Sequence, residues 1–423
     1  MNNKAVRLRF ALLLLTCIIL SSCSSQRTNL SENVLVESQL EKDVQYLAQD
    51  RLEGREIGTP GEIKAALYLD RRYRQLGLIP MGDNQTFFQE FTITPQSNPH
   101  MMGVGGGTAS PVIGRNVAGL LNKGSEYTII IGAHFDHLGW GGAGSLYTGE
   151  RAVHNGADDN ASGVSALLAI ASRLRYLSSN NNYLFVCFSG EEKGLWGSNY
   201  FTDHCPIPLD KINYMINLDM VGRLNEGRRL AINGVGTSPS WKPVIEKLEL
   251  HDLSIVTSNS GVGPSDHTSF YTENIPALHF WTGQHEDYHR PSDDFEKINF
   301  EGIGYVVNYI LAMIVSLDKD KKLVFTKTKD DSPADSRRKF NVTLGVIPDY
   351  LFSGAGMRID GVREDRPAAQ AGLQKGDVVI KMGDYQVENM EGYMNLLGIF
   401  EPGQNVKVIY VREDQVLETD VTF

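Results

Sequence analysis

The sequence predicts an α/β fold with a mixed, largely parallel central sheet flanked by helices, followed by a small mostly-β domain. Continuous apolar runs are typical of central strands that are covered on both faces. They lie at residues 127–131, 183–188, 214–218 and 275–281. Helical spacing of apolar residues between and after these runs, as at 162–177 and 301–317, indicates that strands and helices alternate. Residues 340–423 instead contain short strand-like segments divided by Gly-Asp turns, which predicts the second domain.

The other elements of the first domain, which we expect to span residues 34–317, follow from the same patterns. Helical spacing predicts helices at residues 34–50, 61–76 and 241–250. Weak alternation predicts strands within residues 86–95, and the Pro- and Gly-rich residues 96–112 are expected to form a loop. Residues 318–339 are rich in Lys, Asp, Ser and Arg, so we interpret them as a charged linker.

The composition is that of a globular protein with more than one domain. The chain has 423 residues, of which 41% are hydrophobic and 22% are charged. The formal net charge of −11 argues against nucleic acid as a partner, because phosphate binding requires clustered Lys and Arg side chains.

The first residues resemble a bacterial lipoprotein signal peptide. A basic start precedes an apolar stretch at residues 10–20, which is too short to span a bilayer as a stable helix. Leu20-Ser21-Ser22-Cys23 resembles a lipobox, which implies cleavage before Cys23 and attachment of lipid to it. We expect a signal peptide at residues 1–22, a tether at 23–33, and a lipid anchor in the bacterial cell envelope, on the periplasmic face of the outer membrane or at the cell surface. The alternative is an ordinary secretory signal with an incidental cysteine.

Side chains that can bind a metal ion follow the predicted strands. In an open parallel sheet, sites form beyond the carboxyl ends of the strands, so these side chains should converge. They are His134, Asp136, Glu191, Glu192, Asp219 and His289. Histidines combined with several carboxylates suit Zn²⁺ best, with Mn²⁺ or Co²⁺ as alternatives. The sequence therefore predicts a metal centre at this edge of the sheet.

A polar turn at residues 154–164 belongs to the same set. It places the adjacent acids Asp158 and Asp159 immediately before a predicted helix. Adjacent carboxylates fit a solvated turn, but a carboxylate has two oxygens and can also bridge two metal ions.

Five motifs together resemble those of the M28 metallopeptidases, the family of co-catalytic zinc aminopeptidases. The motifs are His134-Phe-Asp136-His137, Gly156-Ala-Asp-Asp-Asn-Ala-Ser-Gly163, Ser189-Gly-Glu-Glu192, Asn217-Leu-Asp219 and Asp287-Tyr-His289. The resemblance extends over residues 40–317 and implies a zinc exopeptidase fold with two zinc ions per chain.

The resemblance also implies a role for each residue of the site. His134 and Asp219 would hold one zinc ion, Glu192 and His289 the other, and Asp158 would bridge them.

Three more residues would act in catalysis. Glu191 would be the general base for a water activated by the metals, Asp136 would orient His134, and Tyr288 matches a position at which some members place a tyrosine that stabilises an oxyanion. Asp159 is expected only to hold the turn.

The resemblance implies an aminopeptidase that acts on peptides or proteins with free N-termini. The alternatives are a carboxypeptidase- or dipeptidase-type member, a glutaminyl cyclase-like enzyme, or an adaptor whose catalytic domain is vestigial.

The second domain resembles a PDZ domain. Ser353-Gly-Ala-Gly-Met357 is similar to the carboxylate-binding loop of that fold, and residues 367–377 are similar to the helix and turn of its bacterial forms. The resemblance implies a peptide C-terminus as partner. The alternative is a β domain that only packs on the peptidase.

Overall fold

The computed structural model describes residues 38–93, 110–142, 144–318, 322–328, 342–348, 352, 354–362, 366–388, 392–393 and 396–423. The expected signal peptide and tether lie outside these residues, as do most of the loop expected at 96–112 and the greater part of the linker.

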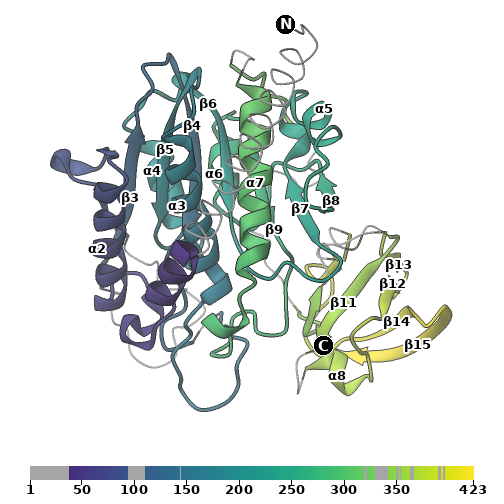
Figure 1. Cartoon of the computed structure of the whole chain (residues 1–423). Helices are drawn as coiled ribbons and strands as arrows, with labels where there is room; N and C mark the ends of the chain where they lie inside the picture. The colour runs from purple at the N-terminus through teal and green to yellow at the C-terminus, as the bar shows by residue number, and fades with distance from the viewer. Residues whose placement is uncertain are drawn as a thin grey trace, which may run out of the picture.

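A nine-stranded mixed sheet forms the centre of the first domain, in the order β1-β3-β5-β4-β6-β9-β7-β8, with β2 paired to β3 (Figure 1). The strands are β1 (Ile79–Pro80), β2 (Phe88–Ile93), β3 (Val112–Leu121), β4 (Tyr127–His134), β5 (Asn181–Phe188), β6 (Ile212–Leu218), β7 (Arg229–Asn233), β8 (Ser254–Ser258) and β9 (Ala277–Trp281). The central strands β5, β4, β6 and β9 are parallel, whereas β3 and β7 join them antiparallel. The predicted mixed sheet is confirmed: four strand pairs are parallel, including those at its centre, and four are antiparallel.

Helices cover both faces of this sheet. A helix at residues 38–47 is followed by α2 (Pro60–Gln75), α3 (Gly163–Leu174), α4 (Trp196–Asp203), α5 (Trp241–Ile245), α6 (His267–Thr272) and α7 (Phe300–Leu317). Successive residues of β4 point to opposite faces: Ile129 and Ile131 pack with the core that includes α2, α3 and α7, and Ile130 packs with Phe201 and Phe270 of α4 and α6.

Several elements were not predicted from the sequence, namely β3, β7, β8, α4 and α6. The polar residues Arg115 and Asn116 interrupt the apolar pattern of β3. Both are satisfied inside the fold, because Arg115 Nη1 lies 2.9 Å from Glu62 Oε2 and Asn116 Nδ2 donates to Gln89 Oε1 at 3.0 Å.

The helix α7 is long and apolar enough to cross a membrane, with 18 residues and a mean hydropathy of 1.6. More than half of it is buried in the protein, where it packs beside α3. Its apolar character is that of a core helix in this fold.

The start of the expected linker packs on the first domain. Leu323 belongs to its core, and the ring of Phe325 lies 5.6 Å from that of Tyr271. Thr326 N also donates to Thr237 O at 2.8 Å. Residues 322–328 are therefore held by the first domain.

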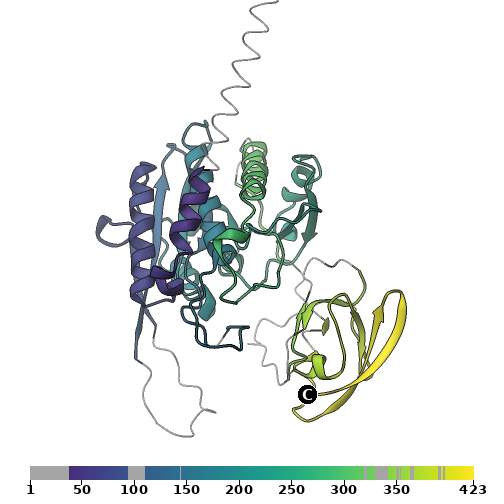
Figure 2. The ribbon, with the colours of Figure 1, turned by 60° about the horizontal axis from the view of Figure 1, so that its bottom comes forward.

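The second domain has its own core and a six-stranded sheet in the order β10-β11-β12-β14-β15, with β13 paired to β12. Its elements are β10 (Val346–Pro348), β11 (Met357–Val362), α8 (Pro367–Gln370), β12 (Val378–Met382), β13 (Tyr385–Gln386), β14 (Asn405–Arg412) and β15 (Gln415–Thr422). Figure 2 shows the long β14–β15 hairpin at one edge. Glu413 and Asp414 form its two-residue turn, both at positive φ.

Candidate metal centre

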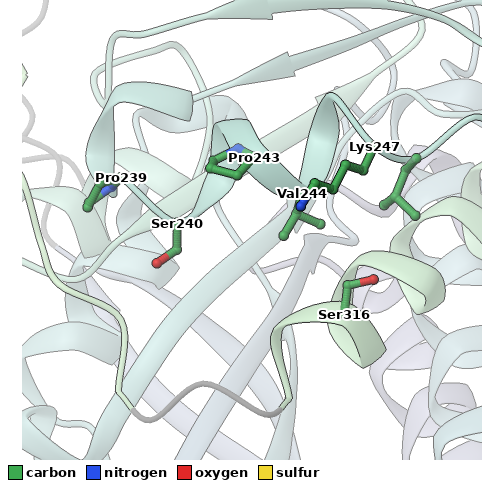
Figure 3. Close-up of a pocket in the computed structure, with 7 residues that line it drawn as sticks. Pro239, Ser240, Pro243, Val244, Lys247 and Ser316 are labelled. Carbon is green, nitrogen blue, oxygen red and sulfur yellow. The ribbon is translucent and has the colours of Figure 1, made fainter.

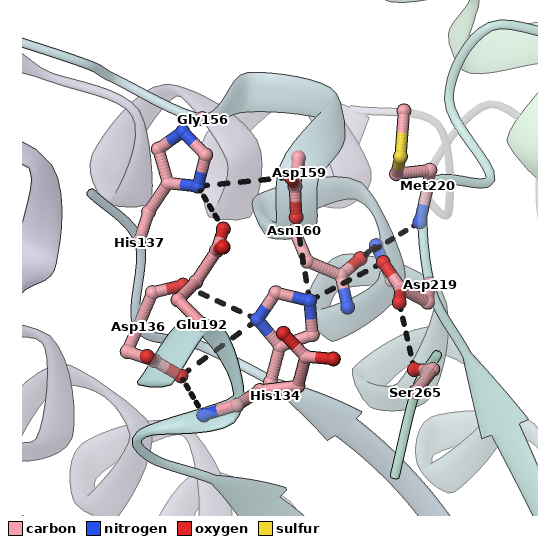
Figure 4. A network of polar contacts seen from close by, with 12 residues as sticks. His134, Asp136, His137, Gly156, Asp159, Asn160, Glu192, Asp219, Met220 and Ser265 are labelled. Carbon is pink, nitrogen blue, oxygen red and sulfur yellow. Dashed lines mark hydrogen bonds and ion pairs between the residues drawn. The ribbon is translucent and has the colours of Figure 1, made fainter. Parts of the chain in front are cut away.

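The carboxyl ends of the parallel strands bring the predicted ligands together, as the sequence led us to expect. His134 is the last residue of β4, the Glu191–Glu192 pair follows β5, and Asp219 follows β6. The turn that opens α3 and the loop after β9 complete the site, and Figure 4 shows most of these side chains around His134.

The first group of candidate ligands surrounds His134 Nε2. This atom lies 3.2 Å from Asp219 Oδ1 and 3.3 Å from Asp159 Oδ1. The three ligand atoms lie within 4.8 Å of one another, which is close enough to hold one metal ion. Ser265 Oγ donates to the other oxygen of Asp219 at 2.7 Å and so fixes the orientation of that carboxylate.

The second group surrounds the other oxygen of Asp159. His289 Nε2 lies 3.2 Å from Asp159 Oδ2 and 3.2 Å from Glu192 Oε2. His137 Nδ1 lies 2.8 Å from Glu192 Oε1 and 3.8 Å from Asp159 Oδ2. His137, Asp159 and Glu192 thus form a second set that could hold a metal ion.

The structure corrects the predicted roles of the two adjacent acids. Asp159, and not Asp158, presents one oxygen to each group. Asp158 instead accepts a hydrogen bond from Gly222 N at 2.6 Å and lies 3.1 Å from His285 Nε2. The backbone departs from helical geometry at Asp159 (φ −103°, ψ 91°), which aims its side chain away from that of its neighbour. The bridging role assigned to Asp158 is therefore wrong, as is the purely structural role assigned to Asp159.

Glu191 and Asp136 lie beside the first group. Asp136 Oδ1 accepts a hydrogen bond from Glu191 N at 3.2 Å, and it lies 3.7 Å from His134 Nδ1. Asp136 therefore contacts both the expected general base and a ligand. Burial raises the pKa of the Glu191 carboxyl well above its ordinary value, and the neighbouring carboxylates of Glu192 and Asp219 raise it further against the effect of His134.

The histidines and carboxylates compensate one another electrostatically. Burial favours neutral imidazoles, but the carboxylates of Asp219 and Glu192 raise the pKa of His134 and of His289 well above the usual value. Conversely, burial favours a neutral carboxyl, but the histidines lower the pKa of Asp159 well below its usual range and that of Glu192 to about 2. These two carboxylates are therefore ionised at neutral pH, as metal ligands must be.

Tyr288 packs against the second group. Its ring stacks on that of His289 with centroids 3.8 Å apart. Burial raises the pKa of the Tyr288 hydroxyl well above its ordinary value, and the charges of Asp159 and Glu192 raise it further. The hydroxyl consequently keeps its proton and can act as a donor.

Several residues of the site were not assigned from the sequence. His137 is the last residue of the first motif, and the resemblance implies no role for it. Asp293 accepts hydrogen bonds from the backbone N–H groups of Asp158 and Asp159, at 3.0–3.1 Å, and so holds the turn in place. Asp293 follows the last motif in the chain. It could not be identified from the sequence, because its partners are backbone groups.

The structure has one pocket that lies apart from these residues and one that borders the loop next to them. A pocket of about 480 Å³ lies between α5 and the end of α7, lined by Pro239, Ser240, Pro243, Val244, Lys247, Leu248 and Ser316, and contains none of the candidate ligands (Figure 3). A pocket of about 350 Å³ is lined by the loop around Trp140, Tyr147 and His154. This loop is tied to the centre, because His289 O accepts from Leu146 N at 2.9 Å.

Comparison with known proteins finds similarity to peptidases and to PDZ domains. The model of peptidase family M28 matches residues 116–314, and a PDZ domain model matches residues 316–423. Aminopeptidase YwaD of Bacillus subtilis is 30% identical over 182 residues, which cover 40% of this chain and 39% of that protein. The chain therefore aligns with less than half the length of this relative.

Two solved structures share the fold of the first domain. BSAP, a zinc aminopeptidase from Bacillus subtilis, superposes with a TM-score of 0.52 at 20% identity, over 68% of this chain and 98% of that chain. The glutaminyl cyclase of Porphyromonas gingivalis superposes with a TM-score of 0.51 at 17% identity, over 66% of this chain and 98% of that chain. Residues 116–314 of this chain thus match the model of peptidase family M28, and the residues that follow them match a PDZ domain model.

Proposed function

We propose that this protein is a zinc-dependent aminopeptidase that hydrolyses the N-terminal peptide bond of peptides or proteins. The observation that carries the proposal is the position of Asp159, whose two oxygens lie 3.3 Å from His134 Nε2 and 3.2 Å from His289 Nε2. One carboxylate shared between two histidine-containing groups is the arrangement that a two-metal hydrolase requires. The match of residues 116–314 to the model of peptidase family M28 supports the same proposal.

The donor set fits two zinc ions. His134, Asp159 and Asp219 would hold one ion, and Asp159, Glu192 and His289 the other, with His137 within reach of the second. Zinc prefers these nitrogen and carboxylate ligands. Bound zinc would supply a Lewis acid that polarises the scissile carbonyl and makes water more acidic.

The protein's own groups would position and move the protons. Glu191, whose backbone N–H is held by Asp136, would take the proton of the attacking water and deliver it to the leaving amine. The Tyr288 hydroxyl would donate to the developing oxyanion.

The test compares peptides with free and blocked N-termini, with and without a zinc chelator. The wild-type protein should release amino acids from free N-termini only, and chelation should abolish the release. Glu191→Gln should lower kcat by about 10²- to 10⁴-fold while retaining its zinc. Glu246→Gln, at an exposed residue that directly follows α5, is the matched control and should behave like the wild type. Equal cleavage of blocked peptides, or full activity of Glu191→Gln, would contradict the proposal.

A glutaminyl cyclase-like activity is the second candidate, because the Porphyromonas gingivalis glutaminyl cyclase shares the fold. A peptide that begins with glutamine distinguishes the two. Release of free glutamine supports the aminopeptidase, whereas a cyclised peptide with loss of ammonia supports the cyclase.

A carboxypeptidase-type member would instead shorten the same peptide from its C-terminus. Full binding of C-terminal peptides by the PDZ domain with no turnover of any peptide would favour the adaptor.

We also propose that the protein is anchored in the cell envelope through lipid on Cys23, as the lipobox-like motif indicates. The wild-type protein should enter the detergent phase on phase partitioning, and Cys23→Ala should enter the aqueous phase. Equal partitioning of both proteins would contradict the anchor.

A further inference from the structure

Arg55 is a buried arginine beneath the candidate metal centre. Arg55 is only 1% exposed, and the donors of its side chain face backbone carbonyl oxygens. Nε donates to Phe135 O at 2.7 Å, Nη1 to Leu47 O at 2.5 Å and to Asn155 O at 2.6 Å, and Nη2 to Gly156 O at 3.0 Å. A planar guanidinium with five donors in a fixed fork can serve such divergent acceptors, whereas an ammonium cannot.

Leu47 O belongs to the helix at residues 38–47, and the other three carbonyls belong to the two segments that carry the shared ligand and its partners. Phe135 lies between His134 and Asp136, and Gly156 lies just before the turn that carries Asp159. One guanidinium group thus joins the end of β4 to the start of that turn. Because His134 belongs to the first group and Asp159 to both, the distance between these segments decides whether Asp159 can reach His134.

The backbone around Arg55 strengthens the same connection. Arg55 O accepts from His137 N at 3.4 Å, and Gly54 O accepts from Gly139 N at 3.1 Å. Gly54 has a φ of +67°, and a Cβ added there would lie 2.4 Å from Gly139 O. The chain can therefore lie against residues 137–139 only with glycine at this position.

Asp293 holds the turn from the opposite side. Its carboxylate accepts from the N–H groups of Asp158 and Asp159, and its carbonyl accepts from Ala157 N at 3.0 Å. The turn therefore gives its N–H groups to Asp293, and the two residues before it, Asn155 and Gly156, give their carbonyl groups to Arg55.

We propose that Arg55 is a positioning residue for the metal centre, which holds the end of β4 and the turn at residues 157–162 at the separation that lets Asp159 serve both groups. The inference rests on the proposed zinc-dependent function. Two effects of Arg55 oppose each other and can be separated. A positive charge near a metal site weakens cation binding, whereas correct placement of ligands strengthens it.

The experiment measures zinc affinity by competition with a coloured chelator, and the visible spectrum of the Co²⁺-loaded protein, for wild type, Arg55→Lys and Arg55→Met. Arg55→Lys keeps the charge but loses the fork, and we expect about 10- to 100-fold weaker zinc binding and a changed Co²⁺ spectrum. Arg55→Met should be weakened similarly. Arg72→Lys is the matched control. Arg72 lies on α2 and is also largely buried, and its Nε lies 2.7 Å from Asp43 Oδ1. This variant should lose stability in urea but keep the zinc affinity and the spectrum.

Distinct outcomes overturn the two proposals. Wild-type zinc affinity and spectrum in Arg55→Lys would overturn the positioning role alone, as would tighter zinc binding by Arg55→Met, which a purely electrostatic role predicts. If both Arg55 variants fail to fold while Arg72→Lys folds, Arg55 is a folding residue and the inference is wrong. Absence of zinc binding by the wild-type protein would overturn the proposed function itself.

Discussion

Asp158 and Asp159 are adjacent in the chain, but their carboxylates contact different parts of the protein. Asp158 faces inward to Gly222 N and His285, and Asp159 faces the histidines of both candidate metal groups. The first acid therefore stabilises the turn, and the second contributes to the site. This division of roles makes the two residues a matched pair for mutagenesis.

Asp159→Asn should lose most of its zinc and nearly all activity, because an amide cannot offer two charged oxygens to two cations. Asp158→Asn should keep its zinc but unfold more easily, by about 1–3 kcal/mol, because a neutral amide keeps an acceptor oxygen for Gly222 N but replaces the carboxylate oxygen that faces His285. Metal analysis after dialysis and urea unfolding measure the two effects. Full zinc occupancy in Asp159→Asn, or loss of zinc confined to Asp158→Asn, would contradict the assignment.

The convergence of the ligands could be predicted from the sequence because it depends on regular structure. Apolar runs mark the central strands, and parallel strands deliver the residues that follow them to one edge. His134 and Asp219 lie where this rule places them. The rule identifies which strand ends meet, and it applies to any parallel sheet.

The choice between Asp158 and Asp159 could not be predicted in this way, because tertiary contacts determine the backbone at this turn. Asn160 Nδ2 donates to Leu218 O at 2.9 Å, and Asp293 binds the N–H groups of both acids. Arg55 gave no signal for the same reason. Its acceptors are backbone carbonyls, which every residue type provides, so no side-chain pattern accompanies them.

Tyr288→Phe should lower kcat by about 10²-fold or more and leave KM nearly unchanged, because the donated hydrogen bond would form mainly in the transition state. The ring that stacks on His289 is retained, so zinc affinity and folding should not change. Steady-state kinetics on a peptide with a free N-terminus measure the effect. Tyr176→Phe, at a tyrosine that is 80% exposed, is the control. A rise in KM alone would contradict the oxyanion role and indicate a substrate contact.

His267 and His279 should make the fold sensitive to acid. Their buried rings stack with centroids 4.7 Å apart, and burial lowers the pKa of His279 from 6.5 to about 4 and that of His267 well below its ordinary value. The neutral rings therefore contribute stability that is fully present above pH 6.5 and is lost as the pH falls toward 4, about 3 kcal/mol for His279.

His267→Phe removes one of these proton-binding groups and keeps the stacked ring. The free energy of unfolding of the variant should fall less steeply than that of the wild type between pH 6.5 and 4, and should be similar at pH 7. Urea unfolding of the metal-free proteins at several pH values gives the comparison, in which the titration of the carboxylates cancels. Parallel pH profiles would show that His267 is not buried in its neutral form.

Tyr271 should control the attachment of the segment that leaves the first domain. Its hydroxyl accepts from Thr328 N at 3.0 Å and from Thr328 Oγ1 at 2.9 Å, and its ring contacts Phe325. Tyr271→Phe keeps the ring but removes the acceptor, which should cost about 1–2 kcal/mol locally. The segment should then detach more often, so trypsin should cleave after Lys327 faster than in the wild type. Tyr385→Phe, in the second domain, is the control and should leave cleavage there unchanged. Equal cleavage rates in Tyr271→Phe and the wild type would mean that Leu323 and Phe325 hold the segment without these hydrogen bonds.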